Sequence, residues 1–189
     1  MERGLCVVII GPVASGKTTV IKHLVQSMPG AVMMRTYTTR PPRKGERESG
    51  DRLFVSREEF ERMIDAGEFV EWDEHFGHLY GSARAVLDGM LDENRAVFTN
   101  INVDGAVNYI ERVPETVTVF IDVPDEQIAG RIENRERIEP EELALRMKEV
   151  ARERSFMDRF DHVVENPNGK LNETFDRMRE ILEAELSAS

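Results

Sequence analysis

Hydrophobic and polar positions alternate along the chain with two different periods, and this pattern predicts strands separated by helices. Residues 5–10 are apolar without interruption, as in a central strand of a parallel sheet whose two faces are both buried. Four further segments rich in apolar residues are predicted as strands, at 31–34, 96–103, 117–121 and 162–164. Strands that alternate with helical patterns indicate an α/β domain with a mostly parallel sheet.

The predicted helices are recognised by their end signals and by apolar residues spaced three or four positions apart. A helix from Lys17 to about Met28 is stopped by the Pro-Gly pair that follows. Ser56 and Glu59 form a capping box, and Pro140 fits the first turn of a later helix. The positions expected to face the core are Phe60, Met63, Ile64, Leu143, Met147, Val150, Leu171, Phe175, Met178 and Leu182.

Two segments fit this alternation poorly. Residues 35–82 are rich in Thr, Arg, Gly and acids, and residues 124–150 are densely charged, with few apolar positions between Gly130 and Glu142. Both are expected to be insertions at the edge of the sheet. Charged segments with little attachment to a core are candidates for moving parts.

Composition narrows the possible classes of protein. The chain has 189 residues, of which 40% are hydrophobic and 32% charged, so one soluble globular domain is expected. Its formal charge of −11 argues against a general nucleic-acid binder. The one cysteine, Cys6, excludes a disulfide framework and a Cys-based metal site. The four histidines are scattered and do not have the spacing of zinc ligands. The longest apolar run is too short to cross a membrane, and a cytoplasmic protein is predicted.

Residues 11–18 read Gly-Pro-Val-Ala-Ser-Gly-Lys-Thr and match the pattern G-x-x-x-x-G-K-[ST] in full. The glycines allow the backbone N–H groups to curl around phosphate oxygens, and the following helix adds its positive end. In this mechanism Lys17 reaches the β- and γ-phosphates, and the Thr18 hydroxyl holds Mg²⁺. The motif follows a buried strand and precedes a helix, so a nucleoside triphosphate site is favoured over a fortuitous glycine turn.

A second anion site is suggested by Arg40 and Arg43, which flank a Pro-Pro pair. Such a segment favours polyproline II, whose three residues per turn place both arginines on one face. That fork suits a phosphate monoester, although a solvated basic loop has the same pattern.

A third group of residues combines Glu71 with Tyr80 and Ser82. In an extended segment, Glu71 lies opposite Val70 and Trp72, where its carboxylate could accept hydrogen bonds from N1–H and the amine of guanine. Ser82 could donate to the base carbonyl, and Tyr80 could reach a phosphate or stack. Taken singly, Glu71 is compatible with an exposed strand acid and Ser82 with a helix N-cap.

With these motifs in order, the chain resembles the guanylate kinase family over essentially its whole length. The P-loop, Thr-Thr-Arg-Pro-Pro-Arg at 38–43, Glu-Phe-Val-Glu-Trp at 68–72 and Tyr-Gly-Ser at 80–82 carry the resemblance. It implies a P-loop NTPase-type three-layer fold with a core (1–34, 88–123 and 151–189), an acceptor-binding insertion (35–87) and a lid (124–150). It also implies transfer of the γ-phosphate of ATP, with Mg²⁺, to a nucleoside monophosphate, GMP or dGMP above all.

The motifs and the resemblance together give a set of expected site residues. The lid arginines and Asn166, near the adenine site, rest on the resemblance alone. The ATP-binding set is Gly11, Pro12, Val13, Ala14, Ser15, Gly16, Lys17, Thr18, Thr19 and Asn166, with Thr18 also on the metal. The acceptor set is Thr36, Arg40, Arg43, Arg52, Glu71, Tyr80, Ser82, Asn100 and Asn102, and the catalytic set is Lys17, Arg40, Arg131, Arg135 and Arg146.

The chain departs from the family pattern at several of these positions. Arg52 stands where the family usually has a tyrosine that touches the acceptor phosphate, and Val13-Ala14 replace Ser-Gly in the P-loop. Asn100 and Asn102 replace acids, and Asp104 replaces a glutamine. An amide in place of a carboxylate removes negative charge and adds a donor, so guanine selectivity or metal positioning could change.

The sequence is therefore also compatible with two functions other than GMP phosphorylation. One is a guanylate kinase-like enzyme acting on another nucleotide or phosphorylated small molecule, as the two asparagines suggest. The other is a non-catalytic module that binds phosphorylated ligands, which the complete P-loop argues against. In each case the expected partners are small nucleotides or phosphorylated ligands, with no nucleic acid and no membrane, and the protein is a monomer or homodimer.

Overall fold

The structure is a computed structural model that describes residues 3–42, 52–75, 77–113, 115–135 and 138–188. Within these ranges, the side chains of His75 and Arg135 are not described.

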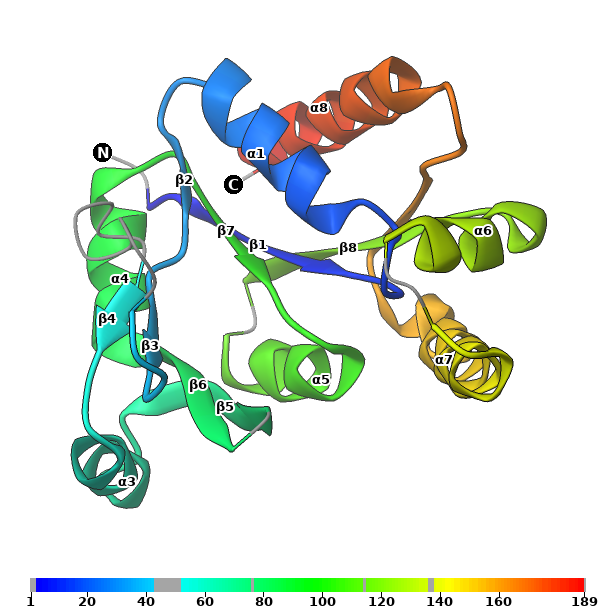
Figure 1. The fold of residues 1–189 in the computed structure, drawn as a ribbon. Coiled ribbons are helices and arrows are strands. Elements are labelled where there is room, and N and C mark those ends of the chain that lie inside the picture. Colours follow the sequence, from blue (N-terminus) through cyan, green and yellow to red (C-terminus); the bar gives the residue numbers. More distant parts are fainter. Residues whose placement is uncertain (1–2, 43–51, 76, 114, 136–137, 189) are drawn as a thin grey trace.

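The centre of the molecule is a five-stranded sheet in which all neighbouring strands are parallel (Figure 1). The continuous apolar run at the start of the chain forms its middle strand, as predicted. The strand order is β2 (Ala31–Met33), β7 (Ala96–Asn100), β1 (Leu5–Ile10), β8 (Thr116–Asp122) and β9 (His162–Glu165).

Helices cover both faces of this sheet, which confirms the three-layer α/β fold (Figure 1). Helices α1 (Lys17–Ser27) and α8 (Leu171–Ala188) pack on one face, against Val7 and Ile9. Helices α4 (Arg84–Glu93) and α5 (Val103–Arg112) pack on the other, against Val8 and Ile10. Each of these four β1 side chains is fully buried, so each stabilises the fold by about 1.5–3 kcal/mol.

Part of the poorly fitting segment 35–82 forms a second, four-stranded sheet that the sequence did not predict. Two of its strands have three residues each, and the other two carry many polar residues, so their alternation is hard to recognise. The order is β4 (Arg52–Phe54), β3 (Thr36–Thr38), β6 (His78–Ala83) and β5 (Phe69–His75), and α3 (Arg57–Asp65) packs against it. The predicted N-cap is confirmed, because Ser56 Oγ accepts a hydrogen bond from Glu59 N at 3.1 Å.

The strand predicted at 96–103 was too long. Strand β7 ends at Asn100, and α5 begins at Val103. The helix starts here because the Asn102 side chain caps it, its Oδ1 accepting from Gly105 N at 2.7 Å. Asn102 therefore lies at the junction of a central strand and a helix that packs against β5.

The charged segment 124–150 has more core than predicted. It contains α6 (Asp125–Arg135) and the start of α7 (Pro140–Arg154), with Pro140 in the first turn as expected. Ile128 and Ile132 are buried one helical turn apart and pack with Val150, so a few apolar residues suffice for a small cluster. Val13 and Ala14 of the P-loop pack against the same cluster. The division into core, insertion and lid stays a prediction.

The last helical signals are confirmed as well. A short 3-10 helix, Met157–Arg159, leads from α7 to β9, and Phe175, Met178 and Leu182 of α8 are buried. Cys6 is buried in β1 with a free thiol, and its burial raises the pKa of that thiol. In the described parts of the chain, no helix is both long enough and apolar enough to cross a membrane.

Candidate active site

A cavity of about 1830 Å³ lies at the carboxyl ends of β1 and β7, between the P-loop, α6 and the second sheet. Residues from the expected ATP side and the expected acceptor side line it together. From the ATP-binding set these are Gly11, Val13, Ala14, Gly16, Lys17, Thr18 and Thr19, and from the acceptor set Thr36, Arg52, Glu71, Tyr80, Asn100 and Asn102. Arg131 of the catalytic set lines it as well. The fold thus brings two sets that are far apart in the sequence to one place.

The P-loop is shaped mainly by its backbone. Gly11 has φ 136°, and a Cβ at this position would lie 2.2 Å from the carbonyl oxygen of Ile121, so no side chain fits. Gly16 has φ 95° and is the N-cap of α1. The ammonium of Lys17 is held at the loop, where Nζ donates to the carbonyl oxygens of Gly11 at 2.5 Å and Pro12 at 2.8 Å.

Ala14 is the non-glycine residue of the described chain with a positive φ, 61°. A left-handed conformation costs an alanine about 1–2 kcal/mol, which explains why glycine suits this position in the P-loop. The methyl groups of the Val13-Ala14 pair pack on the cluster of α6 and α7. The replacement of Ser-Gly therefore adds an apolar contact between the P-loop and segment 124–150.

Asn166 stabilises the P-loop through a hydrogen bond to its backbone, outside the cavity lining. Its side chain is buried; Nδ2 donates to Ser15 O at 2.8 Å, and Oδ1 accepts from Thr174 Oγ1 at 3.3 Å. A Cβ at Gly16 would come within 2.3 Å of the same Nδ2. Asn166, Ser15 and Pro12 are not among the cavity-lining residues, so their side chains act on the site through the loop.

Of the three arginines expected in the lid, Arg131 lines the cavity. Its guanidinium donates to Asn166 O at 2.7 Å and Asn168 Oδ1 at 2.8 Å, and partial burial lowers its pKa. Arg146 lies further along α7, where it pairs with Glu142 at 3.1 Å, and it does not line the cavity. The side chain of Arg135 lies outside the described part of the chain.

On the acceptor side, Arg52 is combined with a hydroxyl and an aromatic ring. Its NH1 donates to Thr36 Oγ1 at 3.1 Å, and its guanidinium carbon lies 5.8 Å from the centre of the Tyr80 ring. All three residues line the cavity. The arginine in place of the family's tyrosine thus brings a positive charge to this side of the site.

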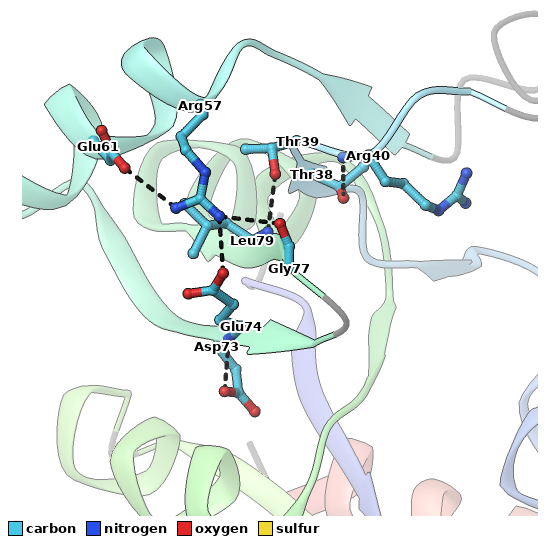
Figure 2. Close-up of polar contacts among 9 residues, drawn as sticks. All are labelled: Thr38, Thr39, Arg40, Arg57, Glu61, Asp73, Glu74, Gly77 and Leu79. Carbon is cyan, nitrogen blue, oxygen red and sulfur yellow. Dashed lines mark hydrogen bonds and ion pairs between the residues drawn. The ribbon is translucent and has the colours of Figure 1, made fainter.

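The predicted arginine fork is not brought together within the described residues. Arg43 lies outside them, and Arg40 is not a cavity-lining residue. The Arg40 guanidinium donates to Pro41 O at 2.9 Å and lies over the Phe54 ring, while its backbone N–H donates to Thr38 Oγ1 at 3.3 Å (Figure 2). The neighbouring Thr39 fixes this segment to β6, because its Oγ1 accepts from Leu79 N at 2.9 Å (Figure 2).

Glu71 and Ser82 form a buried polar pair. They face each other across β5 and β6, and Ser82 Oγ donates to Glu71 Oε1 at 2.9 Å. Glu71 is 8% exposed and Ser82 0% exposed. Glu71 is therefore not an exposed strand acid, and Ser82 is not a helix N-cap, since Ala83 holds that position in α4.

Sequence reasoning missed several cavity-lining residues, among them Asp73 and Glu153. Asp73 accepts from Asn102 Nδ2 at 2.8 Å, a contact between β5 and the start of α5 that no local pattern reveals. Glu153 lies near the end of α7, where burial raises its pKa to about 7 although the nearby charge of Lys17 lowers it. The available signal for Asp73 was its spacing of two from Glu71 on one strand face.

A P-loop at the end of the first strand of a parallel sheet, opening into one cavity with a second polar subsite, defines a P-loop enzyme of the nucleoside monophosphate kinase class. The family model described as Guanylate kinase matches residues 3–185, and the chain belongs to the guanylate kinase family.

Individual relatives agree with this assignment. The chain is 38% identical to a guanylate kinase of Rhodopseudomonas palustris, covering 97% of this chain and 84% of the relative. It is 36% identical to a guanylate kinase of Lactococcus lactis, covering 97% and 89%. The crystal structure of guanylate kinase from Anaplasma phagocytophilum superposes with a TM-score of 0.72 at 32% identity, covering 98% and 88%.

Proposed function

We propose that this protein transfers the γ-phosphoryl group of ATP to GMP, giving ADP and GDP. The observation that carries the proposal is that one cavity is lined both by the P-loop and by Glu71, whose carboxylate accepts a hydrogen bond from Ser82 behind the cavity wall. Phosphoryl transfer depends mainly on holding two phosphates in line and stabilising the charge that develops between them. One cavity lined by both sets of residues meets that requirement.

On the donor side, the P-loop N–H groups and Lys17 hold the phosphates of ATP. Lys17 exchanges its contacts with the Gly11 and Pro12 carbonyls for phosphate oxygens. The Thr18 hydroxyl lines the cavity next to Lys17, and a hydroxyl oxygen fits the preference of Mg²⁺ for hard ligands. When bound, Mg²⁺ would neutralise part of the charge of the ATP phosphates.

On the acceptor side, Arg52, Thr36 and Tyr80 hold the phosphate of GMP. The guanidinium supplies charge and paired donors, and the two hydroxyls supply further hydrogen bonds. Arg40 and Arg43 are proposed to join this group. Arginine here replaces the hydroxyl contact of the family's tyrosine with a charge-assisted one.

Glu71 reads the guanine base. Its carboxylate accepts from N1–H and from one hydrogen of the amine, and the donation from Ser82 fixes its orientation. The N-terminus of α5 lies close by, because a Cβ at Gly105 would be 3.5 Å from Glu71 Oε2. The positive end of that helix favours the ionised carboxylate.

Arg131, Arg135 and Arg146 are proposed to act on the transferring group when segment 124–150 moves over the site. Guanidinium groups there would neutralise charge on the γ-phosphoryl oxygens, and closure would exclude water that otherwise hydrolyses ATP. Asn100, at the end of β7, faces the same region and is proposed to contact the acceptor. A monomer or homodimer in the cytoplasm stays a prediction.

The test is a coupled ADP-release assay with Mg-ATP against GMP, dGMP, AMP, CMP and UMP in parallel. Efficient turnover with GMP and little with AMP, CMP or UMP is expected. A preference for another monophosphate would show that the base subsite recognises the hydrogen-bonding groups of a base other than guanine. A folded, ATP-binding protein that is inactive on all five would contradict the proposal and favour another acceptor or a binding role.

A further inference from the structure

Two carboxylates of β5 point to the same side of the strand. Glu71 and Asp73 are two positions apart and pair with Ser82 and Tyr80 of β6, and both acids line the cavity. Trp72 between them is 46% exposed and is not a cavity-lining residue. The cavity face of this hairpin therefore presents two acids side by side.

Guanine offers more donors than Glu71 alone can satisfy. Its edge carries one hydrogen on N1 and two on the exocyclic amine. Glu71 accepts from N1–H and from one amine hydrogen, and one of its oxygens also accepts from Ser82. The second amine hydrogen needs another acceptor, because a polar group left unpaired in a closed site is costly.

Asn102 is a weaker acceptor for that hydrogen than Asp73, because its side chain is neutral and its Oδ1 already accepts from Gly105 N at 2.7 Å, while its Nδ2 donates to Asp73 Oδ2 at 2.8 Å. Asp73 Oδ1 accepts from Glu74 N at 2.7 Å, and each oxygen of a carboxylate can accept more than one hydrogen bond. What Asn102 adds is a donor that orients Asp73 beside the N-terminus of α5. An acid at position 102, as the family pattern has it, would instead place a second negative charge against Asp73.

We propose that Asp73 is a specificity-determining residue that accepts a hydrogen bond from the exocyclic amine of guanine, with Asn102 as its positioning residue. The inference rests on the proposed function and deepens it by assigning the second carboxylate of the base subsite. Asn102, which departs from the family pattern, then forms one unit with Asp73, because its amide donates to that carboxylate.

The adjacent acid gives a matched control. Glu74 lies on the opposite side of β5 and pairs with Arg57 at 2.8 Å, while Asp73 points away from that arginine (Figure 2). Glu74 is not a cavity-lining residue. Glu74→Gln removes the same charge from the next residue of the strand without touching the base subsite.

The experiment compares GMP with inosine monophosphate, which lacks the exocyclic amine. Asp73→Asn keeps an oxygen for Asn102 but presents an N–H₂ group toward the amine. We expect kcat/KM for GMP to fall about tenfold, mainly through KM, while kcat/KM for inosine monophosphate changes less than about twofold. Glu74→Gln should leave the ratio of the two substrates at its wild-type value.

Equal losses of kcat/KM for both nucleotides in Asp73→Asn would show that Asp73 only supports the hairpin, and unchanged kcat/KM for both would show that it does not contact the amine. Either result overturns the inference while GMP kinase activity stands. The reverse arrangement, Asp73→Asn with Asn102→Asp, should recover part of the preference for GMP. If wild-type protein neither turns over nor binds GMP, the proposed function itself fails, and the two failures are thereby distinguished.

Discussion

The donor and acceptor halves of the cavity are built in different ways. The donor half is one uninterrupted stretch, residues 11–18, whose shape is set by the backbone conformation of Gly11 and Gly16. The acceptor half collects side chains from β3, β4, the β5–β6 hairpin and the start of α5. The phosphates of ATP are held mainly by backbone N–H groups of a loop with the required conformation, whereas a base is recognised by particular side chains.

The two halves are therefore expected to respond differently to substitution. In the donor half, changes that alter the backbone should affect both stability and ATP binding. In the acceptor half, single side chains should change the KM or the preference for GMP and leave ATP binding unaffected.

Lys17→Ala should have the largest effect. Its ammonium is proposed to contact the phosphates of ATP and to stabilise the charge that develops during transfer, so kcat should fall about 10³-fold. The fold should persist, since the described hydrogen bonds of Lys17 Nζ end on the carbonyls of Gly11 and Pro12 within the loop itself. Steady-state kinetics and circular dichroism of Lys17→Ala, with the exposed Lys148→Ala as control, test this; full activity in Lys17→Ala would remove the P-loop from the mechanism.

Gly11→Ala tests the role of the backbone in the donor half. The added methyl would overlap the Ile121 carbonyl, so unfolding free energy should drop by at least about 2 kcal/mol. Gly89→Ala, in the interior of α4 with no atom within 4 Å of its Cβ, should instead raise it by about 1 kcal/mol. Urea denaturation measures both; equal effects in the two variants would show that Gly11 is not under steric constraint.

Arg52→Ala addresses the acceptor half. Loss of the guanidinium beside Thr36 and Tyr80 should raise the KM for GMP about tenfold and leave the KM for ATP unchanged. Arg57→Ala, which removes an arginine on the far side of the hairpin, serves as the control. A matching rise in the KM for ATP would mean that Arg52 does not act on the acceptor alone.

Glu153→Gln is expected to have the smallest effect, visible only as a pH dependence of stability. Burial raises the pKa of Glu153 to about 7, so the folded protein holds this proton more tightly than the unfolded chain. Stability from this group is complete below about pH 4.5 and is lost as the pH rises through 7. The variant should melt about 2 °C higher than wild type at pH 8, with a gap that closes toward pH 5; a gap independent of pH would contradict the assignment.

Much of the fold could be predicted from the sequence because it rests on local patterns. The apolar run at 5–10, the glycines of the P-loop and the amphipathic spacing of α8 each specify their element without distant contacts. The Glu71–Ser82 pair was also within reach, because both residue types lie in adjacent extended segments. The hydrogen bond between them shows why an exposed strand acid for Glu71 and a helix N-cap for Ser82 were both wrong.

What could not be predicted depends on contacts distant in sequence. The hydrogen bond between Asn102 and Asp73 joins residues that are 29 positions apart, and the raised pKa of Glu153 arises from burial against the P-loop region. Segment 124–150 appeared poorly anchored because its charges outnumber its apolar residues. Its attachment comes from a few well-placed ones, Ile128 and Ile132, together with Val13 on the P-loop.

Glu71 is proposed to recognise the guanine base in the cavity that it shares with the P-loop. The most direct test is Glu71→Gln, with kcat/KM measured for GMP and the affinity for ATP measured on the same sample. The account predicts a loss of about 100-fold for GMP, because an amide nitrogen replaces one acceptor oxygen, with ATP affinity unchanged. Unchanged kcat/KM for GMP, or an equal loss of ATP affinity, would contradict it.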